Sequence, residues 1–297
     1  MEWRGVFPAI TTPFREDLSL DLPFLRGHLE GMLAAGCRGF VPLGSLGESA
    51  TLSFDEKAAV LAACRETLGR RAALVAGVAA LSTAEAVAVA RLAADEGCDG
   101  LMVLPPYVYR PDHREMLAHF SAVIAATALP CMLYNNPIAY GTDVLPQDLA
   151  ALAARHANLA AVKESSADVR RVTAIRALCG DRLALFVGVD DLIVEGLAAG
   201  ATGWIAGLVN ALPVESVRLF DLAAGGRGAE ARALYEWFLP LLRLDVVPKF
   251  VQLIKLAQQE CGLGSERVRP PRLVLEGAER AEALAVIRER LGRRPRI

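Results

Sequence analysis

The feature that most restricts the fold of this chain is a repeated alternation of short apolar runs with longer segments rich in alanine and leucine. Strands of a parallel sheet that is covered on both faces are apolar along their whole length, so these runs predict buried parallel strands. Eight such strands, each followed by a helix, are what a (β/α)8 barrel, or TIM barrel, requires; a doubly wound open sheet is the alternative. The predicted strands are residues 5–14, 39–45, 73–78, 100–106, 131–137, 159–166, 183–190 and 203–210.

Start signals for helices lie between these strands. Ser53 and Ser82 are each followed three residues later by a glutamate, which is the capping-box pattern of a helix N-terminus. Pro146 and Pro213 stand where two further helices would begin, and proline is favoured at the first helical position. These signals support an α/β chain in which strand and helix alternate.

Three more helical patterns follow the eighth predicted strand and its helix. They occupy residues 229–244, 248–262 and 277–292, and no flexible linker precedes them. We therefore expect residues 1–225 to form the barrel and residues 226–297 to form a C-terminal helical extension packed on it.

Composition argues against several classes of protein. A formal net charge of -2 without a dense basic cluster does not suit a nucleic-acid-binding protein. Six scattered cysteines without a C-x-x-C pair predict reduced thiols, as in a cytoplasmic protein. The start of the chain lacks the apolar core of a signal peptide, and no apolar stretch reaches the roughly 18 residues of a membrane span. The four histidines form no metal-binding pattern, so no metal site is expected.

A lysine interrupts the sixth apolar run, in the stretch AVKESS. Lysine is rarely buried without a partner or a function, and in barrels of this kind catalytic groups lie at the C-terminal ends of the strands. Ala161 and Ser165 share the strand face of Lys163, and both are small enough to leave room for a ligand. A desolvated lysine has a lowered pKa, and its neutral amine can attack a carbonyl carbon. The alternative is a structural lysine paired with a carboxylate of the barrel.

Two further candidates lie near the ends of neighbouring strands. Tyr134 falls on the strand next to Lys163, where a phenol can shuttle protons; a core tyrosine with a satisfied hydroxyl is the alternative. The segment GSLGE places glycines on both sides of Ser45 and Leu46 at a turn between strand and helix. Exposed amides in such a turn can bind a carboxylate, although a simple tight turn would have the same sequence.

Taken together, GSLGE, LPPY, YNNP, AVKESS and GVDD occur in the order and spacing of one family. Over residues 4–291 the chain resembles the N-acetylneuraminate lyase / dihydrodipicolinate synthase family of Schiff-base enzymes. The resemblance implies that Lys163 forms a Schiff base with a 2-oxo acid or cyclic imine carboxylate, that Tyr134 shuttles protons and that Ser45 helps to hold the carboxylate. It also implies a homotetramer built from two dimers, with no metal or organic cofactor. Substrate contacts are further expected at Leu46, Gly47, Tyr107, Asn136, Gly188 and Ile205.

Three departures from the family pattern bear on the substrate. The family turn often has a second polar residue where this chain has Leu46. In dihydrodipicolinate synthase a second tyrosine completes a proton relay across the dimer interface, but here Tyr107 is followed by Val108. That synthase also binds the carboxylate of its aldehyde substrate with an arginine, and Ala139 stands at this position. We therefore do not expect dihydrodipicolinate synthase activity.

A lysine Schiff base on C2 of a 2-oxo acid acidifies C3, and either cleavage of the C3–C4 bond or loss of a C4 hydroxyl can follow. The fold does not choose between them. GSLGE, YNNPIAYG and KESSADVRR together resemble the branch of 1-pyrroline-4-hydroxy-2-carboxylate deaminases, which act in hydroxyproline degradation and release 2,5-dioxopentanoate and ammonia. An aldolase or dehydratase of 2-keto-3-deoxy sugar acids is the alternative, with Asn136, Tyr140 and Asn210 binding sugar hydroxyls. A catalytically silent barrel that binds a 2-oxo acid is the alternative of another class.

Two other acidic positions have simpler interpretations. Glu48 is expected to interact with the positive N-terminal end of the helix that follows it. Asp190 and Asp191, after the seventh strand, are expected to cap the next helix or to meet substrate near Gly188.

Overall fold

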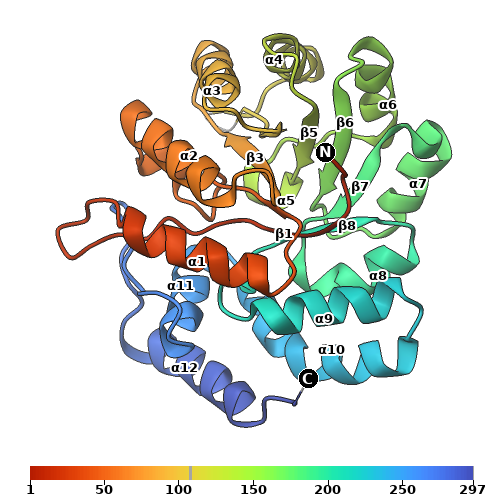
Figure 1. Cartoon of the computed structure of the whole chain (residues 1–297). Coiled ribbons are helices and arrows are strands. Elements are labelled where there is room, and N and C mark those ends of the chain that lie inside the picture. Colours follow the sequence, from red (N-terminus) through yellow and green to blue (C-terminus); the bar gives the residue numbers. More distant parts are fainter. Residues whose placement is uncertain (107–108, 297) are drawn as a thin grey trace.

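The computed structural model of the chain describes residues 1–106 and 109–296. Its centre is one sheet of eight strands in the order β1-β8-β7-β6-β5-β4-β3-β2, and every pairing between these strands is parallel. Figure 1 shows the sheet enclosed by helices. The strands are β1 (Gly5–Pro8), β2 (Gly39–Phe40), β3 (Ala73–Val78), β4 (Gly100–Val103), β5 (Cys131–Asn135), β6 (Leu159–Glu164), β7 (Ala184–Val187) and β8 (Gly203–Ala206).

The sheet closes on itself between β1 and β2. The amide of Arg38 donates to Val6 O at 3.0 Å, and the amide of Val41 donates to Pro8 O at 2.8 Å. Because β1 also pairs with β8, its contact with β2 joins the first and last strands of this order and closes the sheet into a barrel. The predicted (β/α)8 barrel is confirmed, and the open sheet is excluded.

Each strand leads into a helix that covers the outside of the barrel. The start signals are present: Ser53 Oγ accepts from the amide of Glu56 at 3.2 Å, and the carboxylate of Glu56 accepts from the amide of Ser53 at 2.9 Å. Ser82 caps its helix through its side chain, and Pro146 and Pro213 each begin one. The helices of this ring are α1 (Leu22–Ala34), α2 (Phe54–Leu68), α3 (Thr83–Asp95), α4 (His113–Ala125), α6 (Pro146–Arg155), α7 (Arg170–Cys179), α8 (Ile193–Ala198) and α9 (Pro213–Ala224). The single-turn helix α5 (Pro137–Tyr140) directly follows β5, and 3-10 turns lie at η1 (Ser49–Thr51), η2 (Gly180–Arg182), η3 (Asp190–Leu192) and η4 (Leu208–Asn210).

The three helical patterns after the barrel are also helices. They are α10 (Gly228–Leu242), α11 (Phe250–Glu260) and α12 (Gly277–Gly292), and the short turn η5 (Arg243–Asp245) joins the first two. Helix α10 packs on α9, and α12 packs on α10 and α11, below the barrel in Figure 1. The boundary at residue 225 between barrel and extension stays a prediction.

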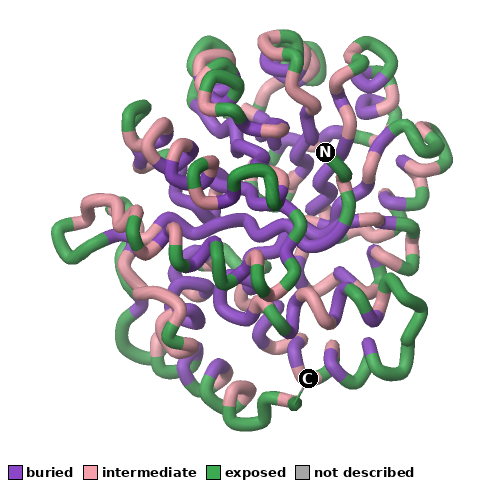
Figure 2. Tube along the Cα trace, in the orientation of Figure 1, coloured by how far each residue is buried: buried purple, intermediate pink, exposed green. Residues whose placement is uncertain are grey.

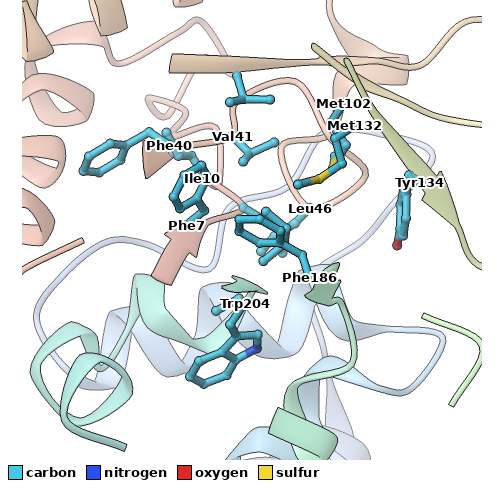
Figure 3. Close-up of a cluster of buried hydrophobic side chains, with 14 of the residues drawn as sticks. Phe7, Ile10, Phe40, Val41, Leu46, Met102, Met132, Tyr134, Phe186 and Trp204 are labelled. Atoms are coloured by element: carbon cyan, nitrogen blue, oxygen red, sulfur yellow. The ribbon is translucent and has the colours of Figure 1, made fainter. Parts of the chain in front are cut away.

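The N-terminal end of the barrel interior is filled by aromatic rings. The ring centroids of Phe7 and Phe186 lie 5.1 Å apart, and Trp3 contacts both rings (Figure 3 shows the two phenylalanines). Glycine makes room for them, because a Cβ on Gly39 would lie 2.4 Å from the Phe7 ring and one on Gly203 would lie 2.2 Å from the Phe186 ring. This close packing leaves the opposite, C-terminal end of the strands as the place for a ligand.

Burial follows this plan over the rest of the molecule. Figure 2 shows the central strands buried, while the outward faces of the surrounding helices are exposed. Among the helices of the described residues, none has the length and hydrophobicity to cross a membrane.

Candidate active site

Lys163 lies on β6 between two aromatic residues of the neighbouring strands. It is in register with Tyr134 of β5 and with Phe186 of β7. Its side chain is buried, and Nζ lies 4.0 Å from the centroid of the Tyr134 ring. The sixth and fifth strands therefore bring the two principal candidates together.

The surroundings of Lys163 favour its neutral form. Burial lowers the pKa of Lys163 to about 8, although the carboxylates of Asp245 and Asp190 oppose this shift. About a tenth of the amines are then neutral at pH 7, far more than for a lysine in water. A neutral amine in this position can attack the C2 carbon of a 2-oxo acid or a cyclic imine.

A chain of hydroxyl groups leads away from the lysine. Tyr134 hydrogen-bonds with Tyr140, whose hydroxyl in turn bonds to Ser45 Oγ, and Asn136 Nδ2 donates to the Tyr134 hydroxyl at 3.0 Å. Burial raises the pKa of Tyr134, and the hydrogen bonds from Asn136 and Tyr140 oppose this rise. A neutral phenol in a hydrogen-bonded chain can pass a proton in either direction. Tyr140 was expected only as a partner of sugar hydroxyls in the sugar-acid alternative, and its place between Tyr134 and Ser45 was not foreseen.

The turn after β2 presents backbone amides toward the same region. Within the described residues, the amides of Ser45, Leu46 and Gly47 donate no hydrogen bond, so they are available to an anion. Gly47 is required here because a Cβ would lie 2.9 Å from Ile10 O. Leu46 is buried and points into the apolar cluster of Figure 3, so its side chain gives the turn no polar group.

Glu48 does not have the capping role expected from the sequence. Its backbone is left-handed, with φ of 53°, and its side chain makes no cap hydrogen bond. The carboxylate instead forms an ion pair with Lys255 of α11 at 2.5 Å and accepts from the amide of Arg269 at 3.0 Å. A buried carboxylate requires such partners, so the C-terminal extension holds the turn that carries Ser45.

Two carboxyl groups, of Asp190 and Asp245, lie at Gly207 and act electrostatically on Lys163. Asp190 is fully buried and accepts hydrogen bonds from Trp204 Nε1 at 2.9 Å and from the amide of Leu208 at 2.8 Å. Asp245, at the end of η5, places Oδ1 2.0 Å from where a Cβ on Gly207 would lie. Burial raises the pKa of Asp190 to about 6 and raises that of Asp245 well above its usual value. Asp245 was missed because it belongs to the extension, far along the chain from the strands.

The remaining predicted contacts have different surroundings. Gly188 leaves space for the lysine, because a Cβ there would lie 2.4 Å from Lys163 Cε. Ile205 is buried in β8 next to Phe7. Tyr107 and Val108 lie outside the described residues. The substrate roles of Gly188, Ile205 and Tyr107 stay predictions.

Asn210, which the sugar-acid alternative assigned to sugar hydroxyls, is not available to a substrate. It is fully buried, and its Nδ2 donates to Ala9 O at 2.7 Å and to Gly207 O at 2.8 Å. The side chain is thus used to join the ends of β1 and β8. In the described part of the chain, no group of three or more histidine, cysteine, aspartate and glutamate side chains could hold a metal ion.

Comparison with known proteins agrees with this geometry. Residues 2–290 match the Dihydrodipicolinate synthetase family. The chain is 35% identical over 273 residues to the 4-hydroxy-tetrahydrodipicolinate synthase of Methanothrix thermoacetophila. These residues cover 91% of this chain and 90% of that relative.

Solved structures give the same result. The 4-hydroxy-tetrahydrodipicolinate synthase from Methylacidiphilum fumariolicum SolV is 30% identical, with a TM-score of 0.91 over 98% of this chain and 97% of that chain. YagE from E. coli K12, a family member solved in complex with pyruvate, is 26% identical, with a TM-score of 0.91 over 98% of this chain and 99% of that chain.

The family resemblance inferred from the motifs is therefore confirmed. Two of the relatives named above carry the name 4-hydroxy-tetrahydrodipicolinate synthase, and none of the three is named as a deaminase. Members of this family react through a covalent Schiff base between a lysine and pyruvate, without a metal or external cofactor. The chain belongs to the dihydrodipicolinate synthetase family and is a Schiff-base enzyme of the aldolase type.

Proposed function

We propose that this enzyme deaminates 1-pyrroline-4-hydroxy-2-carboxylate to 2,5-dioxopentanoate and ammonia, through a Schiff base on Lys163. The observation that carries the proposal is the contrast within one site. A buried amine, a hydroxyl chain and a turn with free amides can bind one carboxylate and react at C2. The family's second polar turn residue and the synthase arginine are replaced by Leu46 and Ala139.

The reaction follows from the groups in the site. The neutral amine of Lys163 attacks C2 of the cyclic imine, and the C2 bond to the ring nitrogen breaks, which opens the ring. Tyr134 takes the proton from C3, the electron pair of the C3–H bond forms a C3–C4 double bond, and the C4 hydroxyl leaves as water. C5 then loses a proton and C3 gains one, which moves the double bond to C4–C5, and the resulting C5 enamine tautomerises to an imine. Hydrolysis of this imine releases ammonia, and hydrolysis of the lysine imine releases 2,5-dioxopentanoate.

Sugar acids are less well supported as substrates. Binding of a polyol tail requires several side chains that can turn toward its hydroxyls. The amide group of Asn210 already donates to two backbone carbonyls. Asn136 donates to the Tyr134 hydroxyl and accepts from the amide of Ala139, each at 3.0 Å. A small cyclic imine with one carboxylate makes fewer demands on this site.

A condensation of pyruvate with an anionic aldehyde is the second candidate, and the names of the relatives point to it. One observation favours it: the Arg110 side chain lies against Gly141, with Nε 3.0 Å from where a Cβ would be. This guanidinium is a possible partner for a second carboxylate near the end of α5. It is exposed and approaches from a different segment than the arginine of the synthase.

The test is intact-mass analysis after borohydride trapping, with 4-hydroxy-1-pyrroline-2-carboxylate and pyruvate in parallel. We expect a reduced adduct of the ring-opened substrate on Lys163, release of ammonia in turnover, and no adduct with a Lys163→Ala variant. A trapped adduct with pyruvate alone, together with consumption of aspartate semialdehyde, would replace the deaminase with the synthase. An adduct with neither acid would contradict the proposed substrate and leave the dehydratase of 2-keto-3-deoxy sugar acids and the catalytically silent barrel as the remaining alternatives.

A further inference from the structure

We infer that Asp245, which the C-terminal extension supplies, is a further catalytic residue that exchanges a proton with the oxygen on C4 of the substrate bound to Lys163. The inference deepens the proposed function, on which it rests because that substrate has a hydroxyl at C4. Neither the motifs nor the strand ends of the barrel point to this residue.

The position of Asp245 supports this role. Asp245 ends η5, which packs against η3, α10 and α11 (Figure 1 shows the two helices). Its carboxyl group lies over Gly207, directly after β8, where any side chain at position 207 would collide with it. The positive charge of Lys163 acts on Asp245, and the amine of Lys163 lies over the ring of Tyr134. Asp245 is therefore within electrostatic range of the same amine that Tyr134 contacts.

Asp245, unlike Asp190, has a carboxyl group that is available to a ligand. Asp190 and Asp245 lie together at Gly207, but the oxygens of Asp190 accept hydrogen bonds from the amides of Gly207 and Leu208 and from Trp204. Within the described residues, the carboxyl group of Asp245 makes no hydrogen bond. Asp190 is thus engaged in the fold, whereas Asp245 is free to contact a ligand.

The protonation state of Asp245 also suits this role. The charged groups around Asp245 are Lys163 of β6, Asp190 and Asp191 of η3, and Arg243 of its own turn, which pairs with Asp191 at 3.5 Å. Burial and the neighbouring charge of Asp190 raise the pKa of Asp245 well above its usual value. The hydrogen bonds donated to Asp190 favour its charged form, and Asp245 has none among the described residues, so Asp245 keeps a proton more readily.

The step that Asp245 serves is the loss of the C4 hydroxyl. After C3 has lost its proton, the enamine electron pair forms the C3–C4 double bond, and the C4–O bond breaks. The departing oxygen takes the carboxyl proton of Asp245 and leaves as water. The Asp245 carboxylate regains a proton from solvent before the next turnover. In a condensation the same group would protonate the aldehyde oxygen, which becomes the oxygen on C4.

The experiment compares Asp245→Asn with the wild-type enzyme and with Glu236→Gln, a matched control that alters an exposed acid of α10. Reactions at C2 and C3 are measured with pyruvate, by borohydride trapping and by exchange of its methyl protons with D2O. Reactions at C4 are measured with 4-hydroxy-1-pyrroline-2-carboxylate, with 2-keto-3-deoxygluconate, and with pyruvate plus aspartate semialdehyde.

For Asp245→Asn we expect trapping and proton exchange within about threefold of wild type, and a loss of about 10²–10⁴-fold in kcat on the C4-oxygenated substrate that the wild type uses. Glu236→Gln should match the wild type in every assay. Turnover by Asp245→Asn close to the wild-type rate would overturn the inference. Equal losses in trapping, exchange and turnover would also overturn it, because Asp245 would then act on the lysine or the fold.

The proposed function and the inference fail separately. If the wild type releases no ammonia but condenses pyruvate with the aldehyde, the deaminase is wrong, and the effect of Asp245→Asn on condensation decides the inference. If the wild type exchanges pyruvate protons but acts on none of the C4-oxygenated compounds, both are wrong.

Discussion

Two buried lysines occupy two regions of the molecule, the mouth of the barrel and the junction between barrel and extension. Lys163 is 6% exposed and Lys255 is 2% exposed. Lys255 makes an ion pair with Glu48 at 2.5 Å and donates to Arg267 O at 2.7 Å. Lys163 makes no ion pair among the described residues, and its amine rests on the Tyr134 ring at 4.0 Å.

The difference shows how a protein can keep a lysine inside. A buried ammonium is stable when a carboxylate and hydrogen bonds replace water, as at Lys255. Without a direct partner the charged form is disfavoured, so the pKa falls to about 8 at Lys163 and a nucleophile results. Burial also lowers the pKa of Lys255, but there the ion pair and hydrogen bond with Glu48 oppose the shift directly. Similar burial therefore gives a structural residue in one region and a reactive candidate in the other.

The largest expected effect is at Lys163. Lys163→Ala should abolish the borohydride-trapped adduct with every 2-oxo acid, because the amine is the only atom that forms it. Thermal unfolding should shift only moderately, because the truncation leaves a cavity and removes the positive charge near Asp190 and Asp245, but breaks no direct ion pair among the described residues. A trapped adduct of unchanged yield in this variant would place the reactive amine elsewhere and break the comparison.

Removal of the Tyr134 hydroxyl should have the next largest effect. Tyr134→Phe keeps the ring under Lys163 Nζ but ends the hydroxyl chain, so kcat should fall about 10²–10⁴-fold. Circular dichroism should be unchanged, because the ring still fills its place. Wild-type kcat in Tyr134→Phe would mean that proton transfer takes another path.

At the junction, stability should change and the lysine chemistry should not. Lys255→Met leaves the Glu48 carboxylate buried without its cation, which should cost about 3–5 kcal/mol in the free energy of unfolding by urea. Adding Glu48→Gln should recover part of this loss. The control is Lys249→Met, which breaks the exposed pair with Glu279 and should hardly move the urea midpoint. A Lys255→Met variant as stable as wild type would contradict the structural role.

The smallest effect concerns pH. Because the pKa of Lys163 is lowered to about 8, the rate of adduct formation with pyruvate should rise about tenfold per pH unit below 8 and level off above it. The lysine gains reactivity as it loses its proton, so the rate rises with pH. The rate is measured by quenching with borohydride at intervals. A rate that keeps rising to pH 10 would show an ordinary lysine.

Much of the fold could be predicted from the sequence because its signals are local. The apolar runs, the cap at Ser53 and the helical patterns after residue 228 each depend on a few neighbouring residues. Lys163 and Tyr134 were recognised for the same reason, since each lies within its own strand motif.

What was missed depends on contacts between distant segments. The pairing of Glu48 with Lys255 and the position of Asp245 over Gly207 are created when the extension docks on the barrel. Asn210 was misassigned because the backbone carbonyls that it binds belong to both β1 and the segment after β8. The substrate itself depends on such side-chain surroundings, which is why the motifs identify the family more readily than the reaction.

The ion pair between Glu48 and Lys255 also has a consequence for the order of events during protein synthesis. All eight strands have left the ribosome once Ala206 emerges, but the cation that neutralises Glu48 is translated later. Until then, closing the barrel would bury an uncompensated carboxylate, which opposes closure. We therefore expect the nascent chain to stay short of its native form until α11 is complete, so that the reactive pocket forms only after residues well beyond the eighth strand have been translated.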